Sequence, residues 1–391
     1  MKFMIINQHT ANFGDDCAVA AVLNSLKERF PSSSTTIVYH DIKGKQAVKM
    51  PPAGNVFEEA PPLYLAKYDI LSLCLYMFSI PFAERLFSDR IVKLKRTFGS
   101  ADFIIVSPCG ANIGVYRDWY FLMKIIVVLA AGKRPIFHLN TIGKSGHPLF
   151  DLLAVRVLQR SKVYVREAAS VAYLAKAGVT AEQGVDSAFG LPALTNVEKI
   201  DEIVVVPTDL TKWFSSYKNF SIDKLSNEMA SVLATVAQRN SLSVRIIPHI
   251  HSEGTEENLL ESFAARVRTN APALKVVVDP AYSDYRAYER RIASARAVVS
   301  MRYHGVVLAA KNAVPFVSVA YENKMQEVAR YCGLSRLAFP ISDWSSERFK
   351  KLLETAIAER EIIEMQLIER GQYLKELAHL PVGNIWLSLQ K

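Results

Sequence analysis

The sequence predicts an α/β protein with two doubly wound, Rossmann-like domains that face each other across a cleft. Short apolar strands alternate with amphipathic helices along most of the chain. The strands are β-branched runs of the kind that parallel sheets bury on both faces. This series runs twice, and the periodicity is lost in between, at Gly190–Asp201. The chain has 391 residues, 50% of them hydrophobic, so it is long enough for two cores and too apolar to be disordered.

The first series predicts an N-terminal α/β domain over residues 1–195. Its strands are apolar runs bounded by turn residues, and its helices show one apolar face. The expected strands are Phe3–Asn7, Thr36–His40, Phe103–Ser107, Pro135–Leu139 and Val163–Arg166. The expected helices are Asp16–Arg29, Trp119–Ala131, Pro148–Gln159 and Ser170–Ala177.

The second series predicts a C-terminal α/β domain over residues 196–344. The expected strands are Ile203–Val206, Val244–Pro248, Leu274–Val278, Ala297–Met301 and Phe316–Ala320. The expected helices are Ile222–Arg239, Glu257–Arg268, Asp284–Ser294, His304–Lys311 and Lys324–Tyr331. A charged helical stretch at Ser345–Leu377 follows, and we expect residues 345–391 to form a helical segment that packs back on the N-terminal domain.

The formal net charge of +9 favours an anionic partner. A phosphorylated metabolite, a nucleic acid and an acidic membrane surface all fit this charge, and a solvated basic face without a ligand is the plain alternative. No basic patch is interleaved with aromatic residues, so we expect no nucleic-acid partner.

The cysteines and the N-terminus predict a cytoplasmic protein. The four cysteines are scattered without a Cys-x-x-Cys pair, which argues against a zinc site or a disulfide framework. The apolar start of the chain is too short for a signal peptide. The apolar runs Leu71–Phe82 and Phe121–Ala131 are shorter than the roughly 20 residues of a membrane span, and we expect both to be buried helices. The basic residues after the first run leave a peripheral contact with the inner face of the plasma membrane as an alternative.

Ligands of doubly wound sheets lie beyond the carboxyl ends of the strands, so the polar residues there are the candidates. After the first strand come Asn12, Gly14, Asp15 and Asp16. Gly14 permits a tight turn, and either acid could cap the next helix. Because carboxylates repel phosphate, we alternatively expect Asn12, Asp15 and Asp16 to orient the hydroxyls of a sugar.

Two further strand ends in the N-terminal domain carry a cation. Lys144 lies in a glycine-bearing loop, but its Gly-Lys-Ser string lacks the upstream glycine of a phosphate-binding P-loop. Arg166 closes a strand and either points into the cleft or forms an ion pair with Glu167 or another neighbour. In the C-terminal domain, His249 and His251 end a strand. They have no clear third metal ligand nearby, so we expect them to line the acceptor side of the cleft.

The segment Ser300–Pro315 places Arg302 and His304 between an apolar strand and a helix. Free backbone N–H groups at the start of that helix favour an anion. The next strand ends just before Lys324, again at a helix start, so Arg302, His304 and Lys324 are expected to converge on one anion pocket. An arginine fork fits a carboxylate, a lysine suits a phosphate, and a histidine can move a proton.

These motifs resemble the polysaccharide pyruvyl transferase family. The similarity rests on a strand followed by Arg302-Tyr303-His304, an alanine-rich helix, Ala313-Val314-Pro315 and Lys324. The segments Asn12–Asp16, Val165–Ser170 and Val185–Phe189 resemble the family's Asn-x-Gly-Asp, Val-Arg-Glu-x-x-Ser and Asp-x-Ala-Phe motifs. The resemblance extends to about residue 335. The loop Asn140–Lys144 departs from the family's Gly-Ile-Gly-Pro-like loop, so no role is carried over to it.

The resemblance implies a GT-B-like fold and a phosphoenolpyruvate donor, which is a co-substrate rather than a cofactor. Pyruvate would be attached as a ketal across two sugar hydroxyls of an exopolysaccharide precursor, with a lipid-linked saccharide as the acceptor. The C-terminal domain would bind the donor and the N-terminal domain the acceptor. Arg302, Tyr303, His304, Lys324 and Arg166 would contact the donor, with His304 as general acid or base. The cations already neutralise the donor, so we expect no metal.

Two other functions remain open at this point. A nucleotide-sugar glycosyltransferase would share the two-domain architecture. A non-catalytic assembly protein at a membrane surface would use the segment from Leu71 to Arg96 as its interface.

Overall fold

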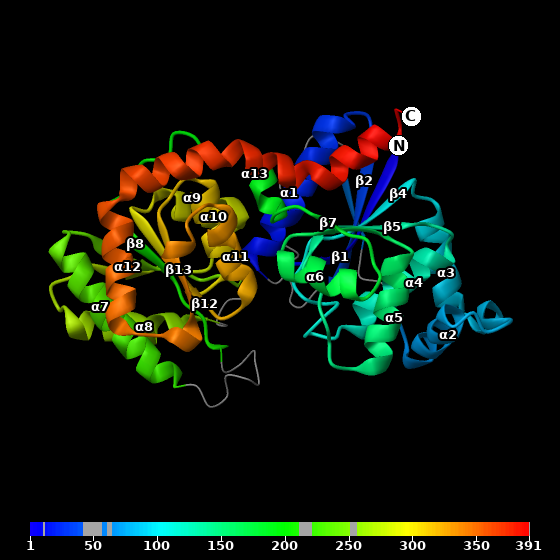
Figure 1. The fold of residues 1–391 in the computed structure, drawn as a ribbon, viewed down its shortest axis with the longest axis horizontal. Coiled ribbons are helices and arrows are strands. Elements are labelled where there is room, and N and C mark those ends of the chain that lie inside the picture. The colour runs from blue at the N-terminus through cyan, green and yellow to red at the C-terminus, as the bar shows by residue number, and fades with distance from the viewer. Residues whose placement is uncertain (11, 42–56, 61–64, 211–220, 251–255, 391) are drawn as a thin grey trace. The chain divides into compact units, whose positions relative to one another are not determined.

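The computed structural model describes residues 1–391 except 11, 42–56, 61–64, 211–220, 251–255 and 391. The chain divides into two compact units (Figure 1). Unit 1 comprises Met1–Thr10, Asp15–Leu191 and Leu374–Lys391. Unit 2 comprises Ala11–Gly14 and Pro192–Tyr373. The break after Leu191 falls within the segment where the sequence loses its periodicity. The end of the chain belongs to unit 1, as does most of the N-terminal half.

Unit 1 is built on a seven-stranded sheet with the order β3-β2-β1-β4-β5-β6-β7. The strands are β1 Lys2–His9, β2 Ser34–Asp41, β3 Phe57–Ala60, β4 Phe103–Val106, β5 Pro135–Asn140, β6 Lys162–Val165 and β7 Glu182–Gln183. The helices are α1 Phe13–Arg29, α2 Lys67–Met77, α3 Asp89–Gly99, α4 Trp119–Ala130, α5 Pro148–Gln159 and α6 Ala168–Lys176. All pairings between these strands are parallel.

Unit 2 is built on a six-stranded sheet with the order β10-β9-β8-β11-β12-β13. The strands are β8 Glu202–Val206, β9 Ser243–Ile246, β10 Val276–Val278, β11 Ala297–Ser300, β12 Phe316–Ala320 and β13 Ala338–Pro340. The helices are α7 Ile222–Arg239, α8 Glu257–Asn270, α9 Tyr285–Ser294, α10 Tyr303–Lys311, α11 Asn323–Tyr331 and α12 Ser346–Ala358. Helix α13, Arg360–Ser388, begins in unit 2 and belongs to unit 1 from Leu374 onward. These strands also pair in parallel. The structure therefore confirms the prediction of an α/β fold with two doubly wound sheets.

Each sheet has a topological switch point, which lies between the two adjacent strands from which the strand order continues in opposite directions. In unit 1 the switch point lies between β1 and β4, since β1 leads outward to β2 while β4 leads to β5. In unit 2 it lies between β8 and β11. The strands beside these points are buried, and every residue of β8 and β12 is shielded from solvent. Crevices beyond the carboxyl ends of such strands are the usual ligand sites of open α/β sheets.

The apolar run Leu71–Phe82 forms only part of a helix, which corrects the expectation of a buried helix over the whole run. Helix α2 ends at Met77, and the left-handed backbone of Ser79 and Phe82 flanks Pro81. Leu73 and Met77 are buried, but Leu71 and Phe82 are 58% and 69% exposed. The second run is buried as expected, in α4. Among the described residues, no helix combines the length and the hydropathy that a membrane crossing requires.

Candidate active site

Ser300 and Gly305 shape the turn between β11 and α10 in unit 2. The Oγ atom of Ser300 accepts a hydrogen bond from the backbone N–H of Arg302 at 3.0 Å and donates one to the Arg302 carbonyl oxygen at 2.7 Å. A Cβ atom at position 305 would lie 2.3 Å from the same Oγ, so this position requires glycine. The turn places Arg302 at the N-cap of α10 and His304 in its first turn. This local geometry explains how two polar residues fit at the end of an apolar strand.

Arg302 is held by Glu256, which the sequence analysis did not identify. Nη2 of Arg302 lies 2.6 Å from Oε1 of Glu256, and both side chains are largely buried. The other carboxylate oxygen of Glu256 accepts hydrogen bonds from the backbone N–H groups of His249 and Ile250, at 2.6 and 2.9 Å. Glu256 thus connects the segment after β9 to the guanidinium of Arg302. Its position just before α8 carries no motif, because only the fold brings it to Arg302.

His304 packs against the N-terminal segment of the chain. A Cβ atom at Gly14 would lie 1.9 Å from Nδ1 of His304, so only glycine allows this approach. Next to Gly14, the backbone N–H of Phe13 donates to the carbonyl oxygen of His249 at 3.3 Å. Asn12 forms an antiparallel bridge with Ile250. Residues 12–14 therefore belong to the surroundings of His304, which gives the Asn-x-Gly-Asp motif a structural role.

Aromatic rings extend from His304 in two directions. The rings of His249 and His304 are stacked with their centroids 6.4 Å apart, and Nδ1 of His249 lies 3.0 Å from the hydroxyl of Tyr288. Tyr288 in turn stacks on Phe13 at 4.9 Å. On the other side, the ring of Tyr303 lies 5.0 Å from that of His304. These contacts fix the orientation of a histidine that is only 6% exposed.

Lys324 lies in the first turn of α11, after the neighbouring strand β12. Its Nζ atom is 5.6 Å from the centre of the Tyr303 ring and 2.6 Å from a carboxylate oxygen of Glu322. Burial raises the pKa of Tyr321, and the charges of Lys324 and Arg302 both oppose this rise. The structure thus brings Arg302, His304 and Lys324 together around Tyr303 and Tyr321. Each cation also has a carboxylate partner, which the sequence analysis did not foresee.

Arg166 lies in unit 1, in a buried ion pair. Its Nη1 atom is 2.7 Å from Oδ2 of Asp186, and its Nε donates to Oγ1 of Thr141 at 3.0 Å. Glu167, the partner considered from the sequence, instead accepts a hydrogen bond from Ser170 at 3.1 Å. The Val-Arg-Glu-x-x-Ser and Asp-x-Ala-Phe segments are therefore joined through Arg166 and Asp186.

The candidate acceptor residues are divided between the two units. Asn12 and His249 lie in unit 2, next to His304, while Asp15, Asp16 and Lys144 belong to unit 1. Both acids follow the start of α1 at Phe13 and so stand within its first turn, not at its N-cap. Asp16 is fully buried. His251 lies outside the described residues.

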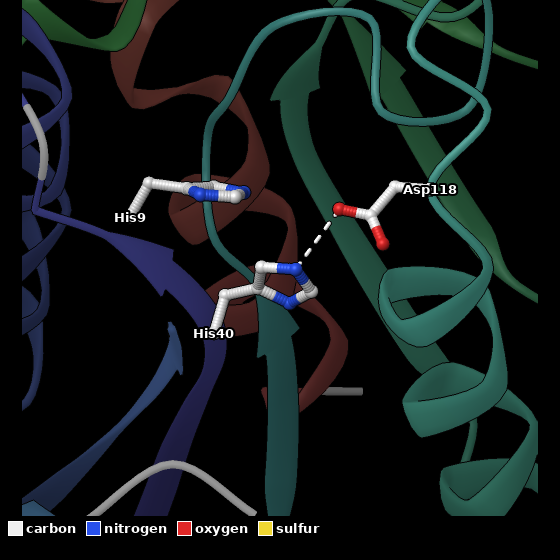
Figure 2. Close-up of side chains that lie close together, drawn as sticks. All are labelled: His9, His40 and Asp118. Carbon is white, nitrogen blue, oxygen red and sulfur yellow. Dashed lines mark ion pairs between the residues drawn. The ribbon is translucent and has the colours of Figure 1, made fainter. Parts of the chain in front are cut away.

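Unit 1 has a further cluster at its own switch point, formed by His9, His40 and Asp118 (Figure 2). His9 ends β1, His40 lies at the end of β2, and Asp118 caps α4 by accepting from the N–H of Phe121 at 2.9 Å. Burial lowers the pKa of His9 to about 4. The pKa of Asp118 falls to about 2, because hydrogen bonds and the charge of His40 together outweigh the effect of its burial, which would raise it. No sequence motif marks this cluster, because its members come from three distant segments.

Comparisons with known proteins agree with this architecture. Residues 12–323 match the family model of the polysaccharide pyruvyl transferases. No curated protein sequence is significantly similar to this chain. Solved structures are similar in fold at low identity. The UDP-GlcNAc 2-epimerase of Neisseria meningitidis has a TM-score of 0.60 and 9% identity, covering 98% of this chain and 99% of its own.

The structures of two glycosyltransferases are also similar in fold to this chain at low identity. A glycosyltransferase of Rickettsia africae has a TM-score of 0.58 and 10% identity, with 100% of this chain and 98% of its own covered. The ugt transferase of Siraitia grosvenorii has a TM-score of 0.56 and 9% identity, with both chains fully covered. These similarities show a GT-B-like fold. The family match covers most of the chain, including the turn of Arg302 and His304, and this protein therefore belongs to the polysaccharide pyruvyl transferase family, a family of transferases.

Proposed function

We propose that this protein transfers the enolpyruvyl group of phosphoenolpyruvate onto two hydroxyls of a sugar in an exopolysaccharide or cell-surface glycan precursor. The observation that carries the proposal is the grouping of Arg302, His304 and Lys324 at the ends of the adjacent strands β11 and β12. Phosphoenolpyruvate carries one carboxylate and one phosphate. A guanidinium fork, an ammonium and the N-termini of two helices match those two groups.

The reaction would proceed in two additions at the same carbon. A proton is added to the methylene carbon of the donor, and the first sugar hydroxyl forms a C–O bond at C2 as it loses its proton. The second hydroxyl then forms a C–O bond at C2 while the bond from C2 to the phosphate oxygen breaks. Of the two protons released by the hydroxyls, one balances the new methyl group and the other leaves with phosphate. The products are a pyruvate ketal and inorganic phosphate.

The chemistry of the side chains in unit 2 suggests a separate role for each of them in this reaction. Arg302 would bind the donor carboxylate, and Lys324 its phosphate. His304 would either protonate the methylene carbon or assist the departing phosphate, a contribution of typically 10²–10⁴-fold. Glu256 would orient the guanidinium of Arg302 toward the donor. A contact of Arg166 with the donor and contacts of Asn12, Asp15 and His249 with the acceptor stay predictions.

Phosphate release from phosphoenolpyruvate tests this proposal. The pure protein is incubated with the donor and a lipid-linked or synthetic β-galactoside or mannoside. We expect acceptor-dependent release that falls by 10²–10⁴-fold in His304→Ala. His147→Asn is a matched control, since His147 caps α5 in unit 1, has no role assigned to it in donor binding, and Asn can keep the cap. Full activity of His304→Ala would refute the assigned role. Absence of release with every acceptor, together with turnover of a UDP-sugar, would instead favour a glycosyltransferase.

We also propose a peripheral contact of unit 1 with the inner face of the plasma membrane, where a lipid-linked acceptor would be found. The proposal rests on large apolar side chains that are exposed on α2 and in the turn after it: Tyr68, Leu71, Ile80, Phe82 and Leu86. The guanidinium of Arg85 lies over the Phe82 ring at 4.4 Å, and α3 adds further basic residues. Apolar side chains beside cations suit an anionic lipid surface.

Vesicle co-sedimentation tests this contact. Phe82→Glu should lower binding to vesicles containing phosphatidylserine, and raised salt should do the same. Ile368→Glu provides a matched control, because Ile368 is 67% exposed on α13. Equal binding of both variants, or no binding by the unaltered protein, would exclude this surface.

A further inference from the structure

The cluster of His9, His40 and Asp118 lies where open α/β sheets bind ligands. His9 and His40 end the paired strands β1 and β2, and Asp118 begins α4, which follows β4 on the other side of β1. The cluster therefore sits at the switch point of the unit 1 sheet, beyond the carboxyl ends of three neighbouring strands. None of the roles assigned above to donor binding uses these side chains.

The polar atoms of the cluster converge on one small space (Figure 2). One ring nitrogen of each histidine and one carboxylate oxygen of Asp118 lie within 4.8 Å of one another. Nε2 of His40 is 2.9 Å from Oδ2 of Asp118. The amide nitrogen of Asn112 is 3.1 Å both from Nε2 of His9 and from Oδ2 of Asp118. The amide nitrogen of Asn112 thus lies between a ring nitrogen at the end of β1 and a carboxylate oxygen at the N-cap of α4.

The charges around the cluster also suit a cation. Asp118 supplies a carboxylate, and His9 and His40 supply imidazoles, which bind a metal in their neutral form. Asp15 adds a second negative charge near His9, while Lys124 adds one positive charge. The Lys124 ammonium donates a hydrogen bond to the carbonyl oxygen of His40 at 2.9 Å. The ring of Phe121 lies beside both imidazoles, with centroids 6.2 Å from that of His9 and 5.8 Å from that of His40.

We propose that His9, His40 and Asp118 form a binding site for a divalent transition metal of the zinc class. Two imidazoles and one carboxylate are ligands of Zn²⁺ and its neighbours, whereas Mg²⁺ and Ca²⁺ prefer oxygen ligands throughout. Three protein ligands leave one position open for an oxygen ligand such as water or a sugar hydroxyl. The site is independent of the proposed donor pocket, and its test does not require pyruvyl transfer.

Metal binding needs two small rearrangements. His40 must carry its proton on Nδ1, so that Nε2 can bind the metal instead of donating to Asp118. The Asn112 amide must turn, which would present its Oδ1 atom where Nδ2 now lies. Both are changes of tautomer or side-chain rotation, and neither moves the backbone. Oδ1 of Asn112 then becomes a fourth ligand, or a hydrogen-bond partner of a ligand in the open position.

The alternative interpretation is a hydrogen-bonded network that only orders the ends of β1 and β2. The two interpretations predict different effects of a substitution at Asn112. A carboxylate at this position would add a charged ligand for a metal, but in a metal-free network it would repel Asp118 across a short distance. Asn112→Asp therefore strengthens metal binding under the proposal, and only destabilises the protein under the alternative interpretation.

Equilibrium dialysis with Zn²⁺, followed by measurement of bound metal, tests the proposal on the full chain. We expect one tightly bound Zn²⁺ per chain, and visible absorption typical of low coordination when Co²⁺ replaces it. His9→Gln, His40→Gln and Asp118→Asn should each weaken binding by at least 10–100-fold, the loss typical even of residues that only support a ligand. Asp118→Asn keeps an N-cap oxygen, so α4 should still form. Asn112→Asp should bind Zn²⁺ more tightly and show the larger rise in Tm on adding it.

Variants of histidines outside the cluster show whether a loss of Zn²⁺ binding is specific to the cluster. His147→Asn removes a histidine outside the cluster and should bind Zn²⁺ as the unaltered protein does. His249→Gln tests whether the histidines of unit 2 take the metal instead. Circular dichroism confirms that each variant is folded. The proposal is overturned if the unaltered protein retains no Zn²⁺ or Co²⁺, if the cluster variants bind as tightly as His147→Asn, or if Asn112→Asp binds more weakly.

Discussion

The backbone of Gly14 lies against the imidazole of His304, so closely that a Cβ atom would stand 1.9 Å from Nδ1. This contact joins two motifs from opposite ends of the chain. The short segment Ala11–Gly14 belongs to unit 2, although β1 and most of α1 belong to unit 1. The glycine of the Asn-x-Gly-Asp motif thus permits the close approach of the His304 ring to the backbone.

Gly14→Ala should therefore damage catalysis. The new methyl group must displace the ring of His304, and a misplacement of about 1 Å can cost on the order of 10²-fold in rate. We expect a fall of that size in kcat, measured as phosphate release at saturating donor. Gly99→Ala is the matched control, because a Cβ there meets nothing within 4 Å. Normal kcat in Gly14→Ala would show that the position of His304 does not matter.

Lys324 and Glu322 should affect donor affinity in opposite directions. The ammonium of Lys324 is partly neutralised by Glu322 at 2.6 Å. Lys324→Met removes a charge-assisted contact with phosphate and should raise KM for phosphoenolpyruvate by about 10-fold or more. Glu322→Gln leaves Lys324 uncompensated and should lower KM. Steady-state kinetics at several donor concentrations separate these effects from changes in kcat, and a fall of KM in Lys324→Met would contradict the assigned phosphate contact.

The ion pair of Arg166 and Asp186 should contribute strongly to the stability of unit 1. Both side chains are almost fully buried, at 3% and 0% exposure. Loss of one partner leaves a buried charge unpaired, so Arg166→Met should lower the free energy of unfolding by about 3–5 kcal/mol. The double variant Arg166→Met/Asp186→Asn should lose less than the sum of the single variants. Urea unfolding measures all three, and strict additivity would argue against direct coupling.

Acid should destabilise unit 1 through His138. Burial lowers the pKa of this imidazole to about 3, so the folded protein keeps it neutral. In the unfolded chain it binds a proton below about pH 6.5. The unfolded state therefore holds more protons between about pH 6.5 and 3, and stability falls there by up to about 1.4 kcal/mol per pH unit as pH is lowered. In His138→Asn this pH dependence, followed by urea unfolding, should be shallower. An unchanged slope would assign the acid sensitivity to other groups.

Much of the fold could be predicted because the apolar runs in the sequence are the segments that the structure buries. The β-branched runs of β8 and β12 are buried on both faces, and α7 and β12 have the expected bounds. Three strands at sheet edges, β3, β7 and β13, were not predicted. The strand β7 has only Glu182 and Gln183, both exposed, and β13 contains a proline. Such short or polar strands form because a neighbouring strand offers free backbone groups, and that neighbour is visible only in the fold.

Some residues of the candidate site could likewise be predicted from the sequence, and others could not. Arg302, His304 and Lys324 could be predicted as candidates because they lie at the cap or in the first turn of a helix that follows a strand, where a parallel sheet places its ligands. Glu256 and the cluster of His9, His40 and Asp118 could not, because their partners come from remote segments without a shared spacing. Glu256 is remote in sequence from Arg302, whereas Glu322 stands two residues before Lys324 and its ion pair becomes visible only in the structure. The two carboxylates make the pocket less positive than its cations alone suggest.

The structure of the reaction product tests the central claim most directly. A β-galactoside acceptor is incubated with phosphoenolpyruvate and the pure protein, and its mass and ¹³C NMR spectrum are recorded. We predict that the acceptor gains the mass of pyruvic acid less one water and a quaternary ketal carbon, and that His304→Ala yields far less of this product. An acceptor that stays unchanged with phosphoenolpyruvate, but gains a sugar from a UDP-sugar, would contradict the account.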